Sequence, residues 1–253
     1  MVSIAVCSGK GGTGKTTVTA NLAVAMAQFG RDVLVVDADI EMANLCFHLG
    51  VDGSSPTLHD VLAGRAELAE AVREAHGVKV LPGAISLKAL KRADPERLEE
   101  VFSALEKHEI VLIDAPAGLG RPVLTALSVS EAALLVVNPE ISSLSDALKT
   151  RVVAGKLDTK VLGAVINRWR GTAEEIPKRD IETVLEAKVL ATIPEDTNVR
   201  AACSFGVPLV LYKPDSPAAQ AVKRLAADLL GEDYRPPKKS IGERLKSLLL
   251  RRG

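Results

Sequence analysis

The sequence has few aromatic residues, few cysteines and no excess of charge of either sign. Its 253 residues include four Phe, two Tyr and one Trp, and 32 Lys and Arg residues balance 32 Asp and Glu residues. A zero net charge argues against a general nucleic-acid binder, because such proteins carry a basic surface that neutralises phosphates. Cys7, Cys46 and Cys203 form no CxxC pair. Their spacing argues against a zinc ribbon, a redox dithiol or a disulfide framework, and is typical of a cytoplasmic protein.

Long apolar runs are also missing. No run reaches the roughly 20 residues that a membrane-spanning helix needs. The opening segment, MVSIAVC, has no basic stretch ahead of a long apolar core. We therefore expect a buried first strand there and not a signal peptide. Any contact with a membrane is expected to be peripheral.

Short apolar runs rich in β-branched residues alternate with helical patterns along the sequence. The predicted strands are Ile4–Cys7, Val33–Asp37, Val78–Leu81, Ile110–Asp114, Ala133–Val137, Val161–Asn167 and Val189–Ile193. Because successive residues are apolar, we expect both faces of a mostly parallel sheet to be buried. The helix candidates between them include Thr16–Phe29, Pro95–Lys107, Ser143–Leu157 and Asn198–Phe205. We predict a single α/β domain over residues 1–230, with helices on both faces of the central sheet.

A glycine-rich loop lies between the first predicted strand and the first predicted helix. Its sequence from Gly9 to Thr16, GKGGTGKT, satisfies the pattern G-x-x-x-x-G-K-[ST]. Glycines let backbone N–H groups approach phosphate oxygens, and the helix adds its positive end. Lys15 is expected to reach the β- and γ-phosphates, and Thr16 to offer its hydroxyl to Mg²⁺. The predicted nucleotide-binding residues of this loop are Gly11, Gly12, Thr13, Gly14, Lys15, Thr16 and Thr17.

The pattern gives no role to a second lysine, Lys10, at the start of the loop. The form KGGTGKT resembles the deviant Walker A motif of the ParA/MinD ATPases, in which the early lysine reaches the nucleotide of a second subunit. The resemblance implies a P-loop NTPase fold, ATP and Mg²⁺ as cofactors, and a homodimer in the ATP state. A cation delivered by a partner would stabilise the transferred phosphoryl group only after assembly. Lys10 and Lys15 are therefore expected to be catalytic in a slow, dimer-activated ATP hydrolase.

Two strand ends supply carboxylates for the metal and the attacking water. The segment DADIEMANL, which begins at Asp37, resembles the first switch of the family, whose second aspartate orients or activates water. The resemblance implies a catalytic role for Asp39 and places it in the metal site with Thr16 and Asp114. Asp114 ends an hhhhD segment typical of Walker B, and is expected to hold Mg²⁺ through a water. The turn from Asp114 to Gly118 resembles a second switch.

Two later segments follow strands and resemble the adenine-contacting segments of the family, although each is also compatible with an ordinary turn. They contain Asn167, Arg168, Pro194, Glu195 and Asp196. The amide of Asn167 is expected to read the edge of the purine. Asp146 occupies the position of an acidic residue that engages the early lysine in MinD-type proteins. The resemblance thus implies a contact between Asp146 and Lys10.

The sequence ends with a predicted linker, residues 231–239, and a predicted amphipathic helix, residues 240–253. Ser240 and Glu243 have the spacing of a capping box. The apolar stripe consists of Ile241, Leu245, Leu248 and Leu249, and the basic residues are Lys238, Lys239, Arg244, Lys246, Arg251 and Arg252. A basic amphipathic helix after a proline-rich linker is typical of a membrane-surface element. A helix docked on the protein's own core, or in the groove of a partner, is the alternative.

The resemblance to MinD-like members of the ParA/MinD family covers nearly the whole sequence. It implies an ATPase whose ATP-dependent dimerisation drives binding to the anionic inner face of the cell membrane and positions cell-division or other machinery. A protein regulator or cargo is expected, and no specific nucleic acid. A ParA-like DNA-partitioning ATPase is the main alternative, which the leucine stripe disfavours. An iron–sulfur scaffold ATPase would need cysteines that residues 47–202 lack, and a non-catalytic nucleotide-gated adaptor is the third alternative.

Overall fold

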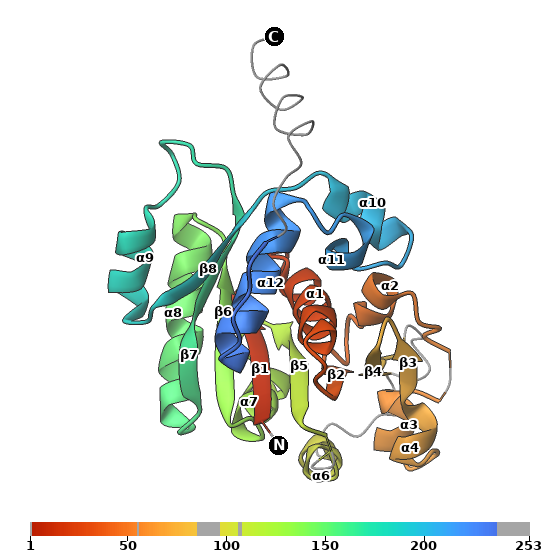
Figure 1. The fold of residues 1–253 in the computed structure, drawn as a ribbon. Helices are drawn as coiled ribbons and strands as arrows, with labels where there is room; N and C mark the ends of the chain where they lie inside the picture. Colours follow the sequence, from red (N-terminus) through yellow and green to blue (C-terminus); the bar gives the residue numbers. More distant parts are fainter. Residues whose placement is uncertain (1, 55, 85–96, 106–107, 237–253) are drawn as a thin grey trace.

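One mixed sheet forms the centre of the molecule (Figure 1). The computed structural model describes residues 2–54, 56–84, 97–105 and 108–236. The strands of the described residues follow the order β3-β4-β2-β5-β1-β6-β7-β8 across the sheet. Their bounds are β1 Val2–Ser8, β2 Val33–Asp37, β3 Arg73–Ala75, β4 Val78–Leu81, β5 Ile110–Ala117, β6 Ala132–Val137, β7 Lys160–Trp169 and β8 Val189–Pro194. Among the described strands only β3 and β4 pair antiparallel, so the predicted single-domain, mostly parallel α/β fold is confirmed.

Helices cover both faces of this sheet, as the sequence predicted. One face carries α1 (Lys15–Gln28), α2 (Leu45–Leu49), α10 (Asn198–Ser204), α11 (Leu209–Tyr212) and α12 (Pro217–Leu230). The other carries α3 (Leu58–Leu62), α4 (Leu68–Ala71), α6 (Leu98–Ser103), α7 (Arg121–Ser128), α8 (Ile141–Lys156) and α9 (Lys178–Leu185). Each face of the sheet therefore has its own hydrophobic core.

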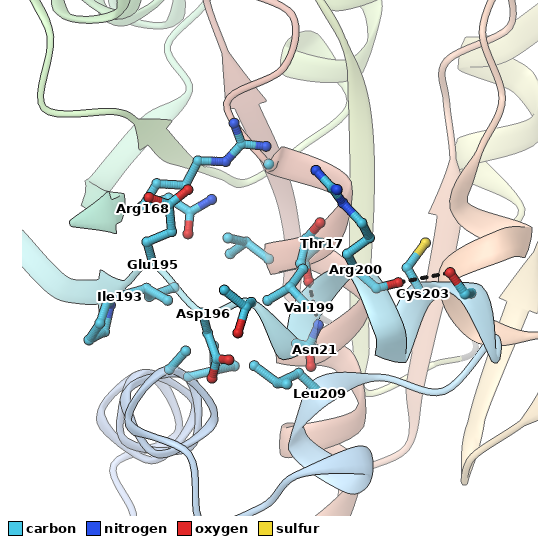
Figure 2. Close-up of a pocket in the computed structure, with 18 residues that line it drawn as sticks. Thr17, Asn21, Arg168, Ile193, Glu195, Asp196, Val199, Arg200, Cys203 and Leu209 are labelled. Carbon is cyan, nitrogen blue, oxygen red and sulfur yellow. Dashed lines mark hydrogen bonds between the residues drawn. The ribbon is translucent and has the colours of Figure 1, made fainter. Parts of the chain in front are cut away.

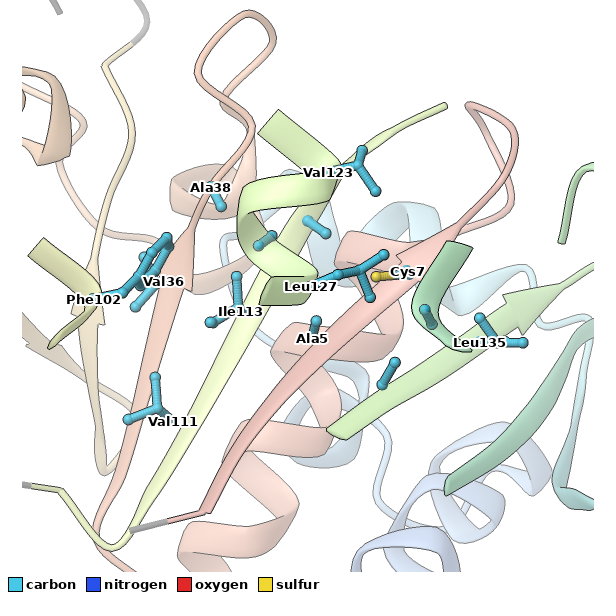
Figure 3. Close-up of a cluster of buried hydrophobic side chains, with 14 of the residues drawn as sticks. Ala5, Cys7, Val36, Ala38, Phe102, Val111, Ile113, Val123, Leu127 and Leu135 are labelled. Atoms are coloured by element: carbon cyan, nitrogen blue, oxygen red, sulfur yellow. The ribbon is translucent and has the colours of Figure 1, made fainter. Parts of the chain in front are cut away.

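The strand β1 shows why the apolar runs are continuous. Ile4 and Val6 belong to the core beneath α1 and α12, whereas Ala5 and Cys7 belong to the opposite core beneath α7 and α8. Figure 3 shows Ala5 and Cys7 beside Leu127 of α7 in that second core. Successive side chains of a strand point to opposite faces, so a strand with helices on both sides needs apolar residues at every position.

The structure adds one strand that the sequence did not reveal. The strand β3 pairs antiparallel with β4 at the edge of the sheet, and its sequence, Arg-Glu-Ala, has no apolar run. An exposed edge strand carries little of the burial signal on which the prediction depended. The predicted helix Pro95–Lys107 is observed as α6, Leu98–Ser103, and its predicted ends include positions outside the described residues.

The chain after α12 turns back onto the body of the protein. The helix ends at Gly231, whose φ of 69° closes it in the left-handed conformation. Glu232 then forms an ion pair with Arg31 at 2.6 Å, and the Tyr234 hydroxyl donates a hydrogen bond to Gln220 Oε1 at 2.9 Å. The first part of the predicted linker thus contacts α12 and the segment that follows α1. The predicted tail helix, residues 240–253, lies outside the described residues. Within the described part of the chain, no helix has the length and apolar character to cross a bilayer.

Candidate nucleotide site

The candidate site lies at the carboxyl edge of the sheet. The loops that follow β1, β2, β5, β6, β7 and β8 all leave the sheet at this edge, because these strands are parallel. The residues that the sequence predicted for nucleotide or metal binding lie in these loops, at the start of α1, or in the carboxyl-terminal halves of strands. The strand residues are Asp114 of β5, Asn167 and Arg168 of β7, and Pro194 of β8. Ligands of open α/β sheets bind in this position, where the strand order reverses on either side of a central strand.

The loop between β1 and α1 presents free backbone at this edge. Gly12 and Gly14 have φ of 79° and 86°, a conformation that only glycine adopts without strain. Gly14 is the N-cap of α1 and offers no side chain to its first N–H groups. A Cβ atom at Gly11 or Gly12 would meet no atom within 4 Å. The loop therefore leaves N–H donors and the positive end of a helix open to an anion.

A buried polar network joins this loop to β5. Lys15 Nζ lies 3.1 Å from Asp114 Oδ1, and both side chains are almost fully buried. The Thr16 hydroxyl donates to Asp114 Oδ2 at 2.6 Å, and the Thr19 hydroxyl donates to Asp114 Oδ1 at 3.1 Å. Burial alone would lower the pKa of Lys15, but Asp114 and the other nearby carboxylates raise it above its usual value. Lys15 is therefore held as a cation inside the protein.

Asp37 organises the loop after β2, a role that the sequence analysis did not assign. It is fully buried and lies opposite Asp114 in the register of β2 and β5. Asp37 Oδ2 accepts hydrogen bonds from the N–H groups of Asn44 at 3.0 Å and Leu45 at 2.9 Å. Burial, followed by the charge of Asp114, raises the pKa of Asp37 to about 7. Asp37 thus ties both ends of this loop, residues 38–44, which we call the switch loop, and fixes the start of α2.

Asp39 lies within the switch loop and is half-buried. Its Oδ1 accepts a hydrogen bond from the Met42 N–H group at 2.9 Å, which closes a turn. Its backbone N–H donates to Asp37 Oδ1 at 3.2 Å. The carboxylate is therefore held by the loop itself, close enough to Lys15 for its charge to contribute to the raised pKa of that residue.

The predicted adenine segments meet around one cavity of about 610 Å³ beside the start of α1 (Figure 2). Its lining includes all five predicted residues, namely Asn167, Arg168, Pro194, Glu195 and Asp196. The sequence did not reveal the opposite wall, which is built by Val199, Arg200 and Cys203 of α10 and by Leu209 of α11. No local motif marks these residues, because they reach the cavity only through the packing of α10 against α2 and of α11 against α1. The cavity is of the size that small-molecule sites usually have.

The amide of Asn167 already has one hydrogen-bond partner within the protein. Its Nδ2 donates a hydrogen bond to the backbone carbonyl of Thr13 at 2.7 Å, and the residue is buried. A Cβ atom at Gly14 would lie only 2.2 Å from this nitrogen. One N–H of the Asn167 amide thus supports the phosphate loop, and the second N–H and the amide oxygen are left to face a purine.

Lys10 lies apart from the buried network of Lys15. Its Nζ contacts Glu140 Oε1 at 3.2 Å and Ser142 Oγ at 3.0 Å, and the Lys10 side chain is 39% exposed. The expected contact with Asp146 is wrong in this structure, because Asp146 forms its ion pair with Lys149 at 2.9 Å. The backbone of Asp146 instead approaches the loop: a Cβ atom at Gly9 would lie 2.1 Å from its carbonyl carbon.

The residues at this edge fit a phosphate chain with Mg²⁺. The Thr16 hydroxyl and the carboxylate of Asp114 are hard oxygen donors in direct contact. The buried Thr13 hydroxyl in the phosphate loop has no hydrogen-bond partner among the described residues. The described residues contain no cluster of three or more His, Cys, Asp or Glu side chains suited to a metal. Mg²⁺ is usually held by one or two protein oxygens, substrate phosphates and water.

Comparisons with known proteins agree with this geometry. The model of the CobQ/CobB/MinD/ParA nucleotide binding domain (CbiA) matches residues 4–209. An uncharacterized ATP-binding protein of Methanocaldococcus jannaschii is 51% identical over 235 residues, covering 92% of this chain and 89% of that protein. The septum site-determining protein MinD complexed with Mg-ADP, from Pyrococcus horikoshii, is 45% identical with a TM-score of 0.87, covering 90% of this chain and 95% of that chain.

A chain of the MinC:MinD cell division protein complex from Aquifex aeolicus is 30% identical with a TM-score of 0.82, covering 95% of this chain and 99% of that chain. These comparisons confirm, over most of the sequence, the resemblance to the ParA/MinD ATPases that the two lysines of the glycine-rich loop indicated. The chain belongs to the CobQ/CobB/MinD/ParA family of nucleotide-binding proteins.

Proposed function

We propose that this protein is a MinD-like ATPase that binds Mg-ATP, dimerises in the ATP state and then binds the membrane surface to position cell-division or other machinery. The observation that carries the proposal is the position of Lys10. This lysine is half-exposed at the mouth of the phosphate loop, whereas Lys15 is buried on Asp114. One loop therefore presents one cation inward, to its own nucleotide, and a second cation outward, to another molecule.

The residues of the site can be given roles in ATP hydrolysis. Lys15 and the N–H groups of the phosphate loop bind the phosphates, and the cavity between Arg168 and Arg200 takes the base. Thr16 and Asp114 would hold Mg²⁺, with Asp39 as a further oxygen donor. When bound, Mg²⁺ neutralises charge on the β- and γ-phosphate oxygens. Asp39 orients the attacking water or accepts its proton.

The surroundings of Lys10 suit a face-to-face dimer. Glu140 and Ser142, which hold Lys10, flank Ile141, whose side chain is 80% exposed. Met42 of the switch loop is 73% exposed at the same edge of the sheet. Large apolar side chains exposed next to a functional site are typical of an interaction surface. The pair of Lys10 with Glu140 is itself exposed, and such pairs contribute at most about 1 kcal/mol, so a phosphate on a partner can displace it.

The membrane part of the proposal depends on the sequence of residues 240–253. One such helix buries few apolar side chains, so its binding is expected to be weak and reversible. Two helices on one dimer act together, and effective concentration raises the overall affinity by roughly 10²–10⁴. Dimerisation on ATP would thereby control the time spent on the membrane. The MinC:MinD complex from Aquifex aeolicus supports the expectation of a protein partner.

The proposal is tested by sedimentation of the full chain with phosphatidylglycerol vesicles in Mg-ATP or Mg-ADP. We expect binding in ATP and little binding in ADP. A chain that ends at Pro236 keeps the contact of Tyr234 with Gln220 and removes the tail, and it should not bind. Leu248→Glu should abolish binding because it places a charge in the apolar stripe. Ser247→Glu adds the same charge beside the stripe and should bind more strongly than Leu248→Glu.

Two results would contradict the proposal. Equal binding in ATP and ADP would remove the link between nucleotide and membrane. Retention on DNA in Mg-ATP, equal for the full chain and the chain that ends at Pro236, would favour the ParA-like partitioning function.

A further inference from the structure

A buried histidine makes a second contact with the switch loop, besides those of Asp37. His59 lies in the short helix α3 and is 1% exposed. Its Nε2 lies 2.8 Å from the carbonyl oxygen of Ile40, the residue directly after Asp39. Its Nδ1 accepts a hydrogen bond from the N–H group of Ala84 at 2.9 Å. Both ring nitrogens are therefore used, one on the switch loop and one on the segment that follows β4.

The partners of the ring fix the position of its proton. The Ala84 N–H group can only donate, so Nδ1 must be the acceptor and the proton must be on Nε2. Nε2–H then donates to the Ile40 carbonyl. Burial lowers the pKa of His59, although the Ile40 carbonyl and Asp60 act in the opposite direction. The imidazole ring of His59 is thus neutral, and its Nε2–H group is the donor to Ile40.

The elements on either side of His59 are anchored to each other. A capping box between Thr57 and Asp60 closes the start of α3, and the Leu58 N–H group donates to the Pro82 carbonyl at 2.9 Å. Gly83 packs so closely on the switch loop that a Cβ atom there would lie 2.5 Å from Ala43 Cβ. The helix that carries His59 is therefore fixed to the segment that follows β4.

We propose that His59 is a positioning residue for Asp39: its Nε2–H group holds the Ile40 carbonyl and so sets the place of the preceding carboxylate. Asp37 binds the switch loop through the N–H groups of Asp39, Asn44 and Leu45, but it contacts no carbonyl of the loop in the described hydrogen bonds. His59 instead donates a hydrogen bond to a carbonyl of the loop, that of Ile40, which directly follows Asp39. The inference rests on the proposed ATPase function, in which Asp39 acts on the attacking water.

Two substitutions each preserve one of the two ring contacts of His59 and remove the other. His59→Gln keeps an N–H donor near the position of Nε2, and His59→Asn keeps an acceptor near the position of Nδ1. We expect His59→Asn to lower kcat for ATP by roughly tenfold or more, because small misplacements of catalytic groups have such effects. KM and the Kd for a fluorescent ADP analogue should stay within about threefold of the parent, since the phosphate loop and base cavity are untouched. His59→Gln should restore most of kcat.

Several outcomes decide the inference. Equal kcat values for the two variants, or a loss confined to KM and Kd, would overturn it. If His59→Asn does not fold, the ¹H–¹⁵N correlation spectrum of the imidazole in the parent protein decides: a proton on Nε2 supports the contact, and a proton on Nδ1 overturns it. A parent chain that binds ADP but never hydrolyses ATP would instead contradict the proposed function, whatever the tautomer.

Discussion

Lys15 Nζ and Asp114 Oδ1 lie 3.1 Å apart in a pair from which solvent is almost excluded. The hydroxyls of Thr16 and Thr19 donate to the same carboxylate. The phosphate loop, the first turns of α1 and the end of β5 are therefore joined through one side chain. Because a buried ion pair is costly to leave half-complete, this contact has consequences for stability as well as for function.

Asp114→Asn should lower the free energy of unfolding by about 3 kcal/mol, because Lys15 would remain buried without its main counter-charge. Urea denaturation measures the change. Glu109→Gln breaks an exposed pair with Arg31 and should cost no more than about 1 kcal/mol. Equal losses for the two variants would show that the Lys15 pair is not the buried, tightly coupled contact described above.

Asp39→Asn should lower kcat for ATP by roughly 100-fold or more, the range expected for loss of a general base. The affinity for nucleotide should stay nearly constant, because the amide oxygen can still accept the Met42 N–H group. Phosphate release and binding of a fluorescent ATP analogue measure the two quantities. Glu41→Gln changes an exposed carboxylate two positions away and should leave kcat unchanged. A similar kcat for Asp39→Asn and the parent would exclude the proposed role.

Substitutions of the two lysines of the phosphate loop should impair different steps, nucleotide binding for Lys15 and dimer-dependent turnover for Lys10. Lys15→Ala should weaken nucleotide binding itself, whereas Lys10→Ala should keep most of the binding and lose the turnover that depends on protein concentration. Lys149→Ala removes another exposed, ion-paired lysine and serves as the control. Titration of the ATPase rate against protein concentration measures the effect. If Lys10→Ala retains the concentration dependence of the parent, Lys10 has no role across a dimer.

Gly50 and Gly206, at the ends of α2 and α10, have no side chains and so allow the two helices to approach closely. A Cβ atom at Gly206, whose φ is 62°, would lie 2.5 Å from Gly50 Cα. Gly206→Ala should therefore destabilise the protein by more than the roughly 1–2 kcal/mol expected for the left-handed conformation alone. Gly30→Ala is the matched control, because its φ is 81° and its Cβ would meet nothing within 4 Å. Urea denaturation compares them, and equal losses would mean that the two helices can separate at little cost.

The parts of the site that are local in sequence could be predicted from the sequence, and the parts that depend on packing could not. The phosphate loop is one continuous stretch whose glycines and lysines reveal its chemistry, and the hhhhD segment reveals Asp114. Asp37 was visible only as a strand-end carboxylate. Its bonds to the N–H groups of Asn44 and Leu45 depend on how the switch loop turns back.

Contacts between distant segments were the least predictable. Lys10 is 130 residues from Glu140 in the sequence, and the resemblance placed it on Asp146 instead. The difference is small in space, because Asp146 lies on α8 and Glu140 is the N-cap of the same helix. Arg200 and Cys203 reach the cavity beside α1 through the packing of α10 against α2 and α11, and no pattern in α10 itself indicates this.

In the proposed dimer, Lys10 of one copy completes the site of another. Sedimentation velocity of the Asp39→Asn protein, in which ATP should persist, tests it most directly. With Mg-ATP we expect a dimer, with Mg-ADP a monomer, and with Mg-ATP after the further substitution Lys10→Ala a monomer again. A dimer that forms equally well in ATP with and without the Lys10 ammonium group would show that Lys10 does not complete the site of a partner.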